Sequence, residues 1–189
     1  MGGFDKRCHL YIFVSMKSGE GKQWNVVYVM SRQEKKVAKR LAGQGIEFYL
    51  PLVKKLQTWS DRKKWVEFPM FNGYVFVRPD DFQRDLVLQQ PGVVAYLSFN
   101  KKHAVVTEKE ISIIKSIEKE GYFAESILSP EDFQPGEKVL VMEGPLKGNT
   151  VDLVRKNNER IFLISFDTLG QSIKVNIPYE FLAKVKDEA

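Results

Sequence analysis

The stretch Phe71-Asn-Gly-Tyr-Val-Phe-Val77 constrains the fold of this chain more than any other segment. Successive side chains of a β-strand point to opposite faces of a sheet, so Tyr74 and Phe76 share one face and Val75 and Val77 share the other. The two valines suit a core beneath packed helices, and the glycine before the strand suits a tight entry turn. The stretch therefore predicts a strand with one aliphatic face and one aromatic face.

The sequence on either side of this strand mixes strand and helix patterns up to about residue 121. Ser31 with Glu34, and Thr107 with Glu110, have the spacing of capping boxes that open helices. A polar turn at residues 60–63 predicts a protruding hairpin. This alternation favours an α+β fold in which helices pack against a mostly antiparallel sheet. The expected strands are 24–30, 46–52, 53–58, 64–68, 73–78 and 93–99, and the expected helices begin at Ser31, Asp81 and Thr107.

The pattern lapses beyond residue 121, where Ser129-Pro130 disfavours helix. Four or five short strands follow, which indicates a small β-barrel. These expected strands are 138–142, 150–156, 160–166, 172–177 and 183–186. We therefore expect an N-terminal extension over residues 1–22, an α+β domain over 23–121, a linker over 122–132 and a β-barrel domain over 133–189.

Charge is unevenly distributed along this 189-residue chain. The net charge is +5, but residues 131–189 hold 8 Lys+Arg against 10 Asp+Glu, a net of −2 that leaves +7 for the remainder. This asymmetry indicates that the first part faces phosphates and the second part faces another partner. The single Cys8 excludes an internal disulfide, and with only His9 and His103 we expect no metal or cofactor. No apolar run is long enough to cross a bilayer, and we expect a cytoplasmic monomer without a membrane partner.

The aromatic residues of the first part predict a binding surface. One aromatic side chain on a sheet is more often part of the core than of a ligand site. Six in so small a domain exceed what its core can cover, and an uncovered aromatic patch is normally a binding surface. These residues are Tyr28, Phe71, Tyr74, Phe76, Tyr96 and Phe99.

These motifs, in this order, resemble the NusG family of transcription elongation factors. The resemblance covers about residues 23–186 and includes a linker where the family has one. It implies a non-enzymatic protein in which an NGN domain precedes an SH3-like KOW barrel. The segments that carry it are 24–29, 31–41, 47–52 and 71–77 for the NGN domain, and 133–141 and 143–148 for the KOW domain.

The resemblance implies that the NGN domain binds the clamp helices of RNA polymerase through a hydrophobic pocket and bridges the cleft that holds the nucleic acids. Bridging favours the closed clamp and disfavours pausing. The pocket positions are the six aromatic residues just named, which we expect to be open to solvent. Gln83, Arg84 and Asp85 would face the opposite wall of the cleft. Basic residues would contact DNA phosphates near the transcription bubble, mostly without sequence specificity. They are Arg32, Lys36, Lys39, Lys54, Lys55, Arg62, Lys63 and Lys64.

Two departures from the family pattern are informative. Asn72 stands where the family commonly has proline, which makes the loop less rigid. Leu146 replaces a phenylalanine that the KOW domain uses in partner contacts, which argues against recruitment of the termination factor Rho and, less strongly, of a small-subunit ribosomal protein. The chain therefore resembles a specialised antiterminator paralogue. The expected partner-binding turn of the KOW domain is Gly144, Pro145, Leu146, Lys147 and Gly148.

Two other functions fit the sequence less well. A KOW-type RNA-binding or ribosome-associated protein would use Lys147, Arg155, Lys156 and Arg160, but the acidic balance of the second part argues against it. An enzyme acting on nucleic acid needs a nucleophile motif, paired histidines, a metal cluster or a phosphate loop, and the sequence contains none of these patterns. The favoured interpretation is a polymerase-bound elongation or antitermination factor.

Overall fold

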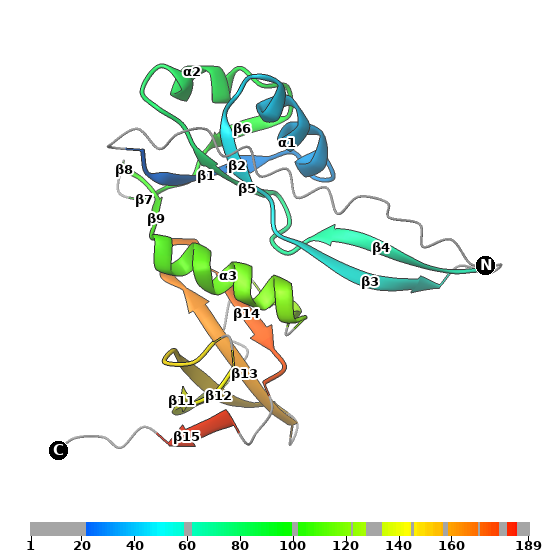
Figure 1. Cartoon of the computed structure of the whole chain (residues 1–189), viewed down its shortest axis with the longest axis vertical. Helices are drawn as coiled ribbons and strands as arrows, with labels where there is room; N and C mark the ends of the chain where they lie inside the picture. The colour runs from blue at the N-terminus through cyan, green and yellow to red at the C-terminus, as the bar shows by residue number, and fades with distance from the viewer. Residues whose placement is uncertain are drawn as a thin grey trace, which may run out of the picture.

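The structure is a computed structural model of the chain, and it describes residues 22–58, 62–99, 102–121, 123–127, 134–144, 146–156, 159–169, 171–177 and 181–184. These residues form an α+β first lobe (residues 22–121) and an all-β second lobe (residues 123–184), as Figure 1 shows. The extension expected over residues 1–22 lies outside the described residues, apart from Lys22. None of the helices in the described ranges has the length and apolar character needed to cross a membrane.

The first lobe is built on a five-stranded antiparallel sheet. Its order is β2-β5-β1-β6, and β9 also pairs with β1. Val26 lies opposite Phe76, and Tyr28 lies opposite Tyr74. The strands predicted around Tyr28 and Tyr74 are thus confirmed, as neighbours at the centre of the sheet. The strands are β1 (Trp24–Val29), β2 (Glu47–Tyr49), β5 (Tyr74–Arg78), β6 (Val93–Tyr96) and β9 (Val105–Val106).

Helices cover both faces of this sheet. α1 (Glu34–Gly43) and α2 (Gln83–Leu88) pack on one face, where Val37 and Val87 join Val75 and Val77 in an aliphatic core without solvent exposure. α3 (Glu108–Glu120) lies against the opposite face, between the sheet and the second lobe (Figure 1). The valine face of β5 is therefore covered by helices, as its alternation predicted.

The starts of α1 and α3 differ. The Thr107 hydroxyl accepts from the Glu110 N–H at 3.2 Å and the Glu110 carboxylate accepts from the Thr107 N–H at 2.7 Å, so the capping box predicted for α3 is confirmed. The capping box predicted for Ser31 and Glu34 is wrong, because Gln33 is the N-cap of α1 and makes no side-chain capping bond. Glu34 is instead buried within the lobe, with 5 % of its surface exposed.

A two-stranded hairpin projects from the first lobe (Figure 1). It consists of β3 (Leu52–Thr58) and β4 (Lys63–Pro69), and it confirms the predicted hairpin, although residues 59–61 of its turn lie outside the described residues. Its base is joined to α3, because the Glu118 carboxylate accepts from the Tyr49 hydroxyl at 2.7 Å and from the Leu52 N–H at 2.9 Å. A shorter pair, β7 (Ser98–Phe99) and β8 (Lys102–His103), follows β6.

The second lobe is a six-stranded antiparallel sheet with the order β10-β14-β13-β12-β11-β15. Its first strand corrects one expectation: residues 123–127, assigned to the linker, form β10 and pair with β14. The strands are β10 (Phe123–Ile127), β11 (Gln134–Val141), β12 (Thr150–Lys156), β13 (Glu159–Phe166), β14 (Gln171–Val175) and β15 (Leu182–Lys184).

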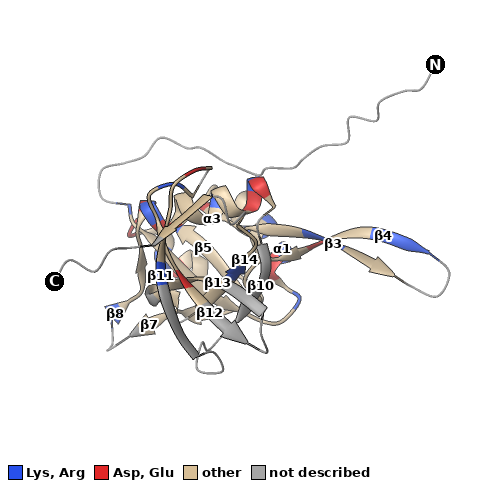
Figure 2. Ribbon diagram, turned by 90° about the horizontal axis from the view of Figure 1, so that it is seen from below, with Lys and Arg blue, Asp and Glu red and all other residues tan. Residues whose placement is uncertain are grey.

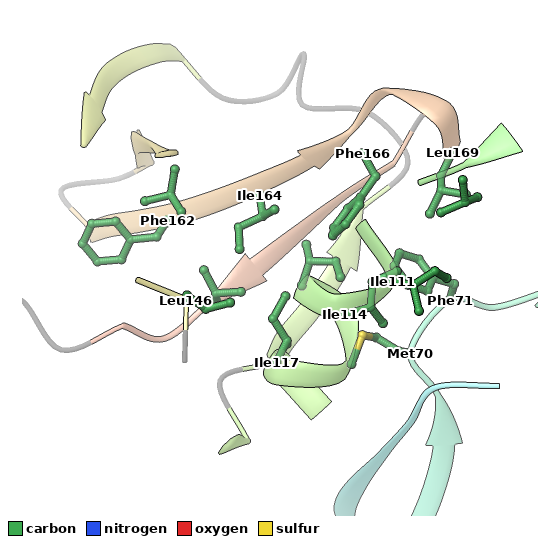
Figure 3. Close-up of a cluster of buried hydrophobic side chains, with 14 of the residues drawn as sticks. Met70, Phe71, Ile111, Ile114, Ile117, Leu146, Phe162, Ile164, Phe166 and Leu169 are labelled. Carbon is green, nitrogen blue, oxygen red and sulfur yellow. The ribbon is translucent and has the colours of Figure 1, made fainter. Parts of the chain in front are cut away.

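The two lobes share one hydrophobic core, shown in Figure 3. Ile111, Ile114 and Ile117 of α3 are at most 1 % exposed and cluster with buried residues of both lobes. The ring of Phe71 in the first lobe lies 5.9 Å from the ring of Phe166 in β13, measured between centroids. The two lobes are therefore in direct contact through apolar side chains.

Candidate functional site

The aromatic face of the two central strands carries most of the predicted pocket. Trp24, Val26 and Tyr28 alternate along β1 on this face, next to Tyr74 and Phe76 of β5. Tyr28 and Tyr74 are direct cross-strand partners, and their rings meet edge to face with centroids 5.8 Å apart. The sheet therefore brings together rings that lie far apart in the sequence.

Gly73 lets the loop before β5 approach Tyr28 closely. Its φ of +80° lies in the left-handed region, which favours glycine. A Cβ at this position would lie only 3.0 Å from Cε2 of Tyr28. The Gly73 N–H donates to Glu34 Oε1 at 2.8 Å, and the Gly73 carbonyl accepts from the Val29 N–H at 2.8 Å. The loop is thus held to both α1 and β1, and it positions the Tyr28 ring.

The prediction that the whole pocket is open to solvent is wrong for Phe71 and Phe76. Phe71 is 1 % exposed and Phe76 is fully buried. The centroid of the Phe71 ring lies 5.7 Å from that of the Phe76 ring and 5.9 Å from that of the Phe166 ring. Both rings belong to the core that the sheet shares with α3 and the second lobe, where Figure 3 shows Phe71, so they have more apolar partners than the first sheet alone provides.

The tyrosine end of the same face remains open. Tyr28 is 48 % exposed and Tyr74 is partly buried. Met30, just beyond the end of β1, is 60 % exposed. Exposed aromatic and methionine side chains on a rigid sheet are typical of protein-binding surfaces. We call the Tyr28–Tyr74 pair the tyrosine patch.

Tyr96 does not lie on the aromatic face. It pairs with Val27 and belongs to the core beneath α1 and α2, so the prediction that it lines the pocket is wrong. The Tyr96 hydroxyl donates to the Arg84 carbonyl at 3.2 Å, and the centroid of its ring lies 4.9 Å from that of the His103 ring. Burial raises the pKa of Tyr96 to about 12. Phe99 lies in β7, outside the central sheet, and its side chain is not among those described.

α2 carries the residues expected to face the far wall of the cleft. Asp80 Oδ1 accepts from the Gln83 N–H at 2.9 Å and Gln83 Oε1 accepts from the Asp80 N–H at 3.1 Å, so the Gln83 side chain is engaged in the turn that precedes α2. The hydrogen bond from the Gln83 N–H lowers the pKa of Asp80. Arg84 pairs with Asp81 at 3.3 Å, and Asp85 is exposed. Arg84 and Asp85 thus remain the better candidates for a contact.

Phe82 was missed by the sequence reasoning. Its side chain is 91 % exposed directly before α2, and Leu86, one turn further, is 39 % exposed. The spacing of Phe82 and Leu86 is visible in the sequence, but the same spacing also suits a buried helix face. In the structure Val87 is the buried residue of α2, which leaves Phe82 in solvent.

The predicted basic residues lie on two elements that an ion pair joins. Lys35 Nζ lies 3.6 Å from Glu67 Oε2 and also donates to the Glu67 carbonyl at 2.9 Å, which links α1 to β4. Arg32, with a positive φ of 62°, precedes α1, and Lys36 and Lys39 are exposed on that helix. The other predicted residues belong to the hairpin, whose basic segments are blue in Figure 2, and each of them is exposed: Lys54, Lys55, Arg62, Lys63 and Lys64.

The turn between β11 and β12 is only partly accessible. Leu146, one residue of the predicted partner-binding turn, is 1 % exposed and is part of the core of the second lobe, so its side chain does not offer a contact at the surface. Gly144, Lys147 and Gly148 are exposed, whereas Pro145 lies outside the described residues. A partner could therefore reach the backbone of the turn and Lys147.

Comparison with known proteins found one family match and several structural matches. Residues 22–115 match the family model described as "NusG: Transcription termination factor nusG". A solved structure described as "Domain interaction in Thermotoga maritima NusG" is 20% identical, with a TM-score of 0.53, over 87% of this chain and 98% of that chain. Two structures of the MjSpt4:Spt5 complex, in conformations A and B, are 18% identical over 86% of this chain and cover 97% and 96% of theirs, with TM-scores of 0.28 and 0.29.

The family match spans about half of the chain and includes the central sheet, the tyrosine patch and the start of α3. The Thermotoga maritima structure shares the order of an α+β lobe followed by an antiparallel β lobe. Through the domain that residues 22–115 form, this chain belongs to the NusG family, whose members are non-enzymatic transcription factors.

Proposed function

We propose that this chain is an elongation factor that binds the clamp helices of RNA polymerase through the tyrosine patch and suppresses pausing or termination. The observation that supports this most is the edge-to-face pair of Tyr28 and Tyr74, which is partly open to solvent on a rigid sheet. Tyrosine supplies a large contact area with two side-chain torsions, so little conformational entropy is lost on binding. An amphipathic helix could place its apolar side chains against these rings.

Phe71 and Phe76 have a supporting role in this proposal. Both are buried, and Phe71 is in contact with Phe166 of the second lobe. A partner that needed to touch Phe71 would first have to displace the second lobe. The tyrosine patch can be reached without that change.

The nucleic acids would lie beside the two basic elements. In this proposal Phe82, Arg84 and Asp85 face the opposite wall of the cleft, and the basic residues of α1 and the hairpin contact DNA phosphates. Such contacts release counterions, so binding would weaken as salt concentration rises.

The second lobe would recruit a further factor, in keeping with a specialised antiterminator. The backbone of Gly144 and Gly148 and the side chain of Lys147 are the accessible part of its turn. Because Leu146 is buried, a small-subunit ribosomal protein or Rho would have to bind without a contact to that side chain.

The proposal is tested by measuring the binding of purified core RNA polymerase to the full chain and to the variant Tyr28→Ala/Tyr74→Ala. Loss of aromatic residues at the centre of an interface typically removes about 2 kcal/mol or more, so we expect at least ~30-fold weaker binding. Tyr28→Phe/Tyr74→Phe keeps the rings and should bind nearly as the unchanged chain does.

Met142→Ala is the matched control, because Met142 is 45 % exposed on the second lobe, away from the tyrosine patch. Thermal unfolding of each variant shows whether it is folded. Unchanged polymerase binding by a folded double-alanine variant would show that the tyrosine patch is not the site. Tight binding of structured RNA by the full chain, with no affinity for polymerase, would favour the RNA-binding alternative.

A further inference from the structure

The β3–β4 hairpin carries two large apolar side chains in solvent. Trp65 is 65 % exposed and Leu56 is 47 % exposed. They are direct partners across the antiparallel pair, so they share one face of the hairpin. Their contact helps to hold the two strands together, but most of the surface of the indole remains uncovered. We call these two residues the apolar pair.

Cationic side chains lie on both sides of the apolar pair along this face. Lys54 lies toward the body of the protein, opposite Glu67, and Lys63 lies toward the tip, opposite Thr58. All four are exposed. Thr58, the partner of Lys63, lies four residues beyond Lys54, and four residues along a strand span about 13 Å. The exposed indole therefore lies between two positive charges that are about this far apart.

An open groove of ≈ 710 Å³ adjoins the indole. Three lysines and one glutamate line the groove, and the glutamate already pairs with Lys35 at 3.6 Å. The net charge of the groove lining is therefore positive. Its lining residues are Lys35, Lys54, Lys64, Trp65, Val66 and Glu67.

We propose that this face of the hairpin binds single-stranded nucleic acid, with one base stacked on the indole of Trp65 and the flanking phosphates paired with Lys54 and Lys63. An aromatic ring between cations is how proteins bind unpaired strands, because every base has a face that stacks. A paired base inside a duplex has no free face for the indole, so single strands should be preferred.

This inference rests on the proposed function only for its biological setting, because a transcription bubble supplies unpaired strands. The binding itself needs no polymerase and can be measured with free oligonucleotides. The hairpin variants should bind core polymerase normally, and the tyrosine-patch variants should bind oligonucleotides normally. Failure of one proposal therefore leaves the other intact.

The experiment titrates the full chain into a fluorescein-labelled 12-mer of oligo(dT) at low salt and records anisotropy. Trp65→Val keeps a good strand former but removes the ring, and we expect its Kd to rise roughly 5- to 150-fold, the range for the loss of one stacked base. Trp65→Phe keeps a ring and should stay within about 5-fold of the unchanged chain. Phe82→Ala removes an even more exposed aromatic ring, 91 % against 65 % for Trp65, from the position before α2 and should leave the Kd unchanged.

Salt dependence tests the lysines separately. Each phosphate contact on a single strand contributes about 0.7 to the slope of log Kd against log salt, so Lys63→Gln should reduce the slope by about 0.7. The quenching of tryptophan fluorescence by oligo(dT) should fall in Trp65→Phe, because the stacked indole is gone.

Three results would overturn the inference: no oligo(dT) binding by the unchanged chain, equal or tighter binding of a 12-base-pair duplex, or a Trp65→Val Kd within twofold of the unchanged value. Circular dichroism and thermal unfolding establish that Trp65→Val is folded. If Trp65→Val binds weakly while Trp65→Phe binds nearly as the unchanged chain does, the loss is due to stacking and not to a disrupted hairpin. Tighter binding of oligo(rU) than of oligo(dT) would support the site and identify RNA as its preferred strand.

Discussion

Glu34 accepts a hydrogen bond at 2.8 Å from the backbone N–H of Gly73, across 39 residues of chain. The bond joins the first turn of α1 to the loop that leads into β5. Because the same loop approaches Tyr28, one buried carboxylate of α1 helps to position the tyrosine patch on the opposite face of the sheet.

Replacement of Glu34 by alanine is expected to destabilise the first lobe. The Gly73 N–H would lose its partner while it remains buried, and an unsatisfied buried donor typically costs about 1–3 kcal/mol. Urea unfolding of the full chain measures this loss. Glu143→Ala, at an exposed position of the second lobe, is the control for the loss of a carboxylate. The assignment is wrong if the two variants unfold at the same urea concentration.

Gly73→Ala should lower the free energy of unfolding more than Gly148→Ala does. Both glycines have φ of +80°, so an alanine at either position has the same backbone strain, about 1–2 kcal/mol. Only the Cβ at position 73 would also meet a neighbour within 4 Å, the Tyr28 ring edge at 3.0 Å, whereas position 148 has open space. We expect an additional loss of about 1 kcal/mol or more in the free energy of unfolding.

A double-mutant comparison checks the origin of that difference. If the clash with Tyr28 is responsible, Gly73→Ala should destabilise Tyr28→Ala no more than Gly148→Ala does. An additional loss that persists without the Tyr28 ring would place the cause elsewhere in the loop.

Phe71 and Phe166 are expected to be energetically coupled between the lobes. Their rings meet edge to face at 5.9 Å, and such pairs contribute about 0.5–1.5 kcal/mol beyond their buried area. A double-mutant cycle with Phe71→Leu and Phe166→Leu, followed by urea unfolding, measures the coupling; leucine retains an apolar side chain at each site.

A second cycle with Phe71→Leu and Phe162→Leu is the control, because Phe162 lies in the second lobe without a ring contact to Phe71 among the described pairs. The effects in this control should add within about 0.5 kcal/mol. Additive effects in both cycles would show that the lobes are not coupled through these rings.

Stability should fall at high pH through Tyr96. Burial raises its pKa to about 12, above the ordinary value near 10, so the folded state keeps a proton that the unfolded chain loses. This contribution to stability is fully present below pH 10 and is lost as pH rises from about 10 to 12, by about 2–3 kcal/mol in total.

The variant Tyr96→Phe isolates this effect. It removes the ionisable group and also the hydrogen bond to the Arg84 carbonyl, so it should be less stable at neutral pH but should lose less stability between pH 10 and 12. Urea unfolding across that pH range gives both slopes. Parallel slopes for the two proteins would contradict the assignment.

Much of the first lobe could be predicted because its signals are local. Alternation along residues 74–77 correctly separated the helix-covered valines from the aromatic face. The spacing of Thr107 and Glu110 correctly placed the start of α3, and the polar turn correctly predicted the hairpin. In each case the residues that decide the structure lie within a few positions of one another.

The candidate site depended more on contacts between distant segments. Glu34 has the spacing of a capping residue, yet the Gly73 N–H is its partner. Tyr96 fits an aromatic strand pattern, but its register opposite Val27 places it beneath the helices. Leu146 fits a surface turn, but its side chain enters the core of the second lobe. No local pattern specifies these partners.

Alternation along the chain was sufficient to show which rings share a face, because side-chain direction in a strand follows from the backbone alone. Which of those rings meet solvent was settled only by the packing of α3 and the second lobe, which places Phe71 and Phe76 in a shared core and leaves Tyr28 exposed. Burial depends on segments that approach from elsewhere in the chain, and their arrival is a property of the assembled core.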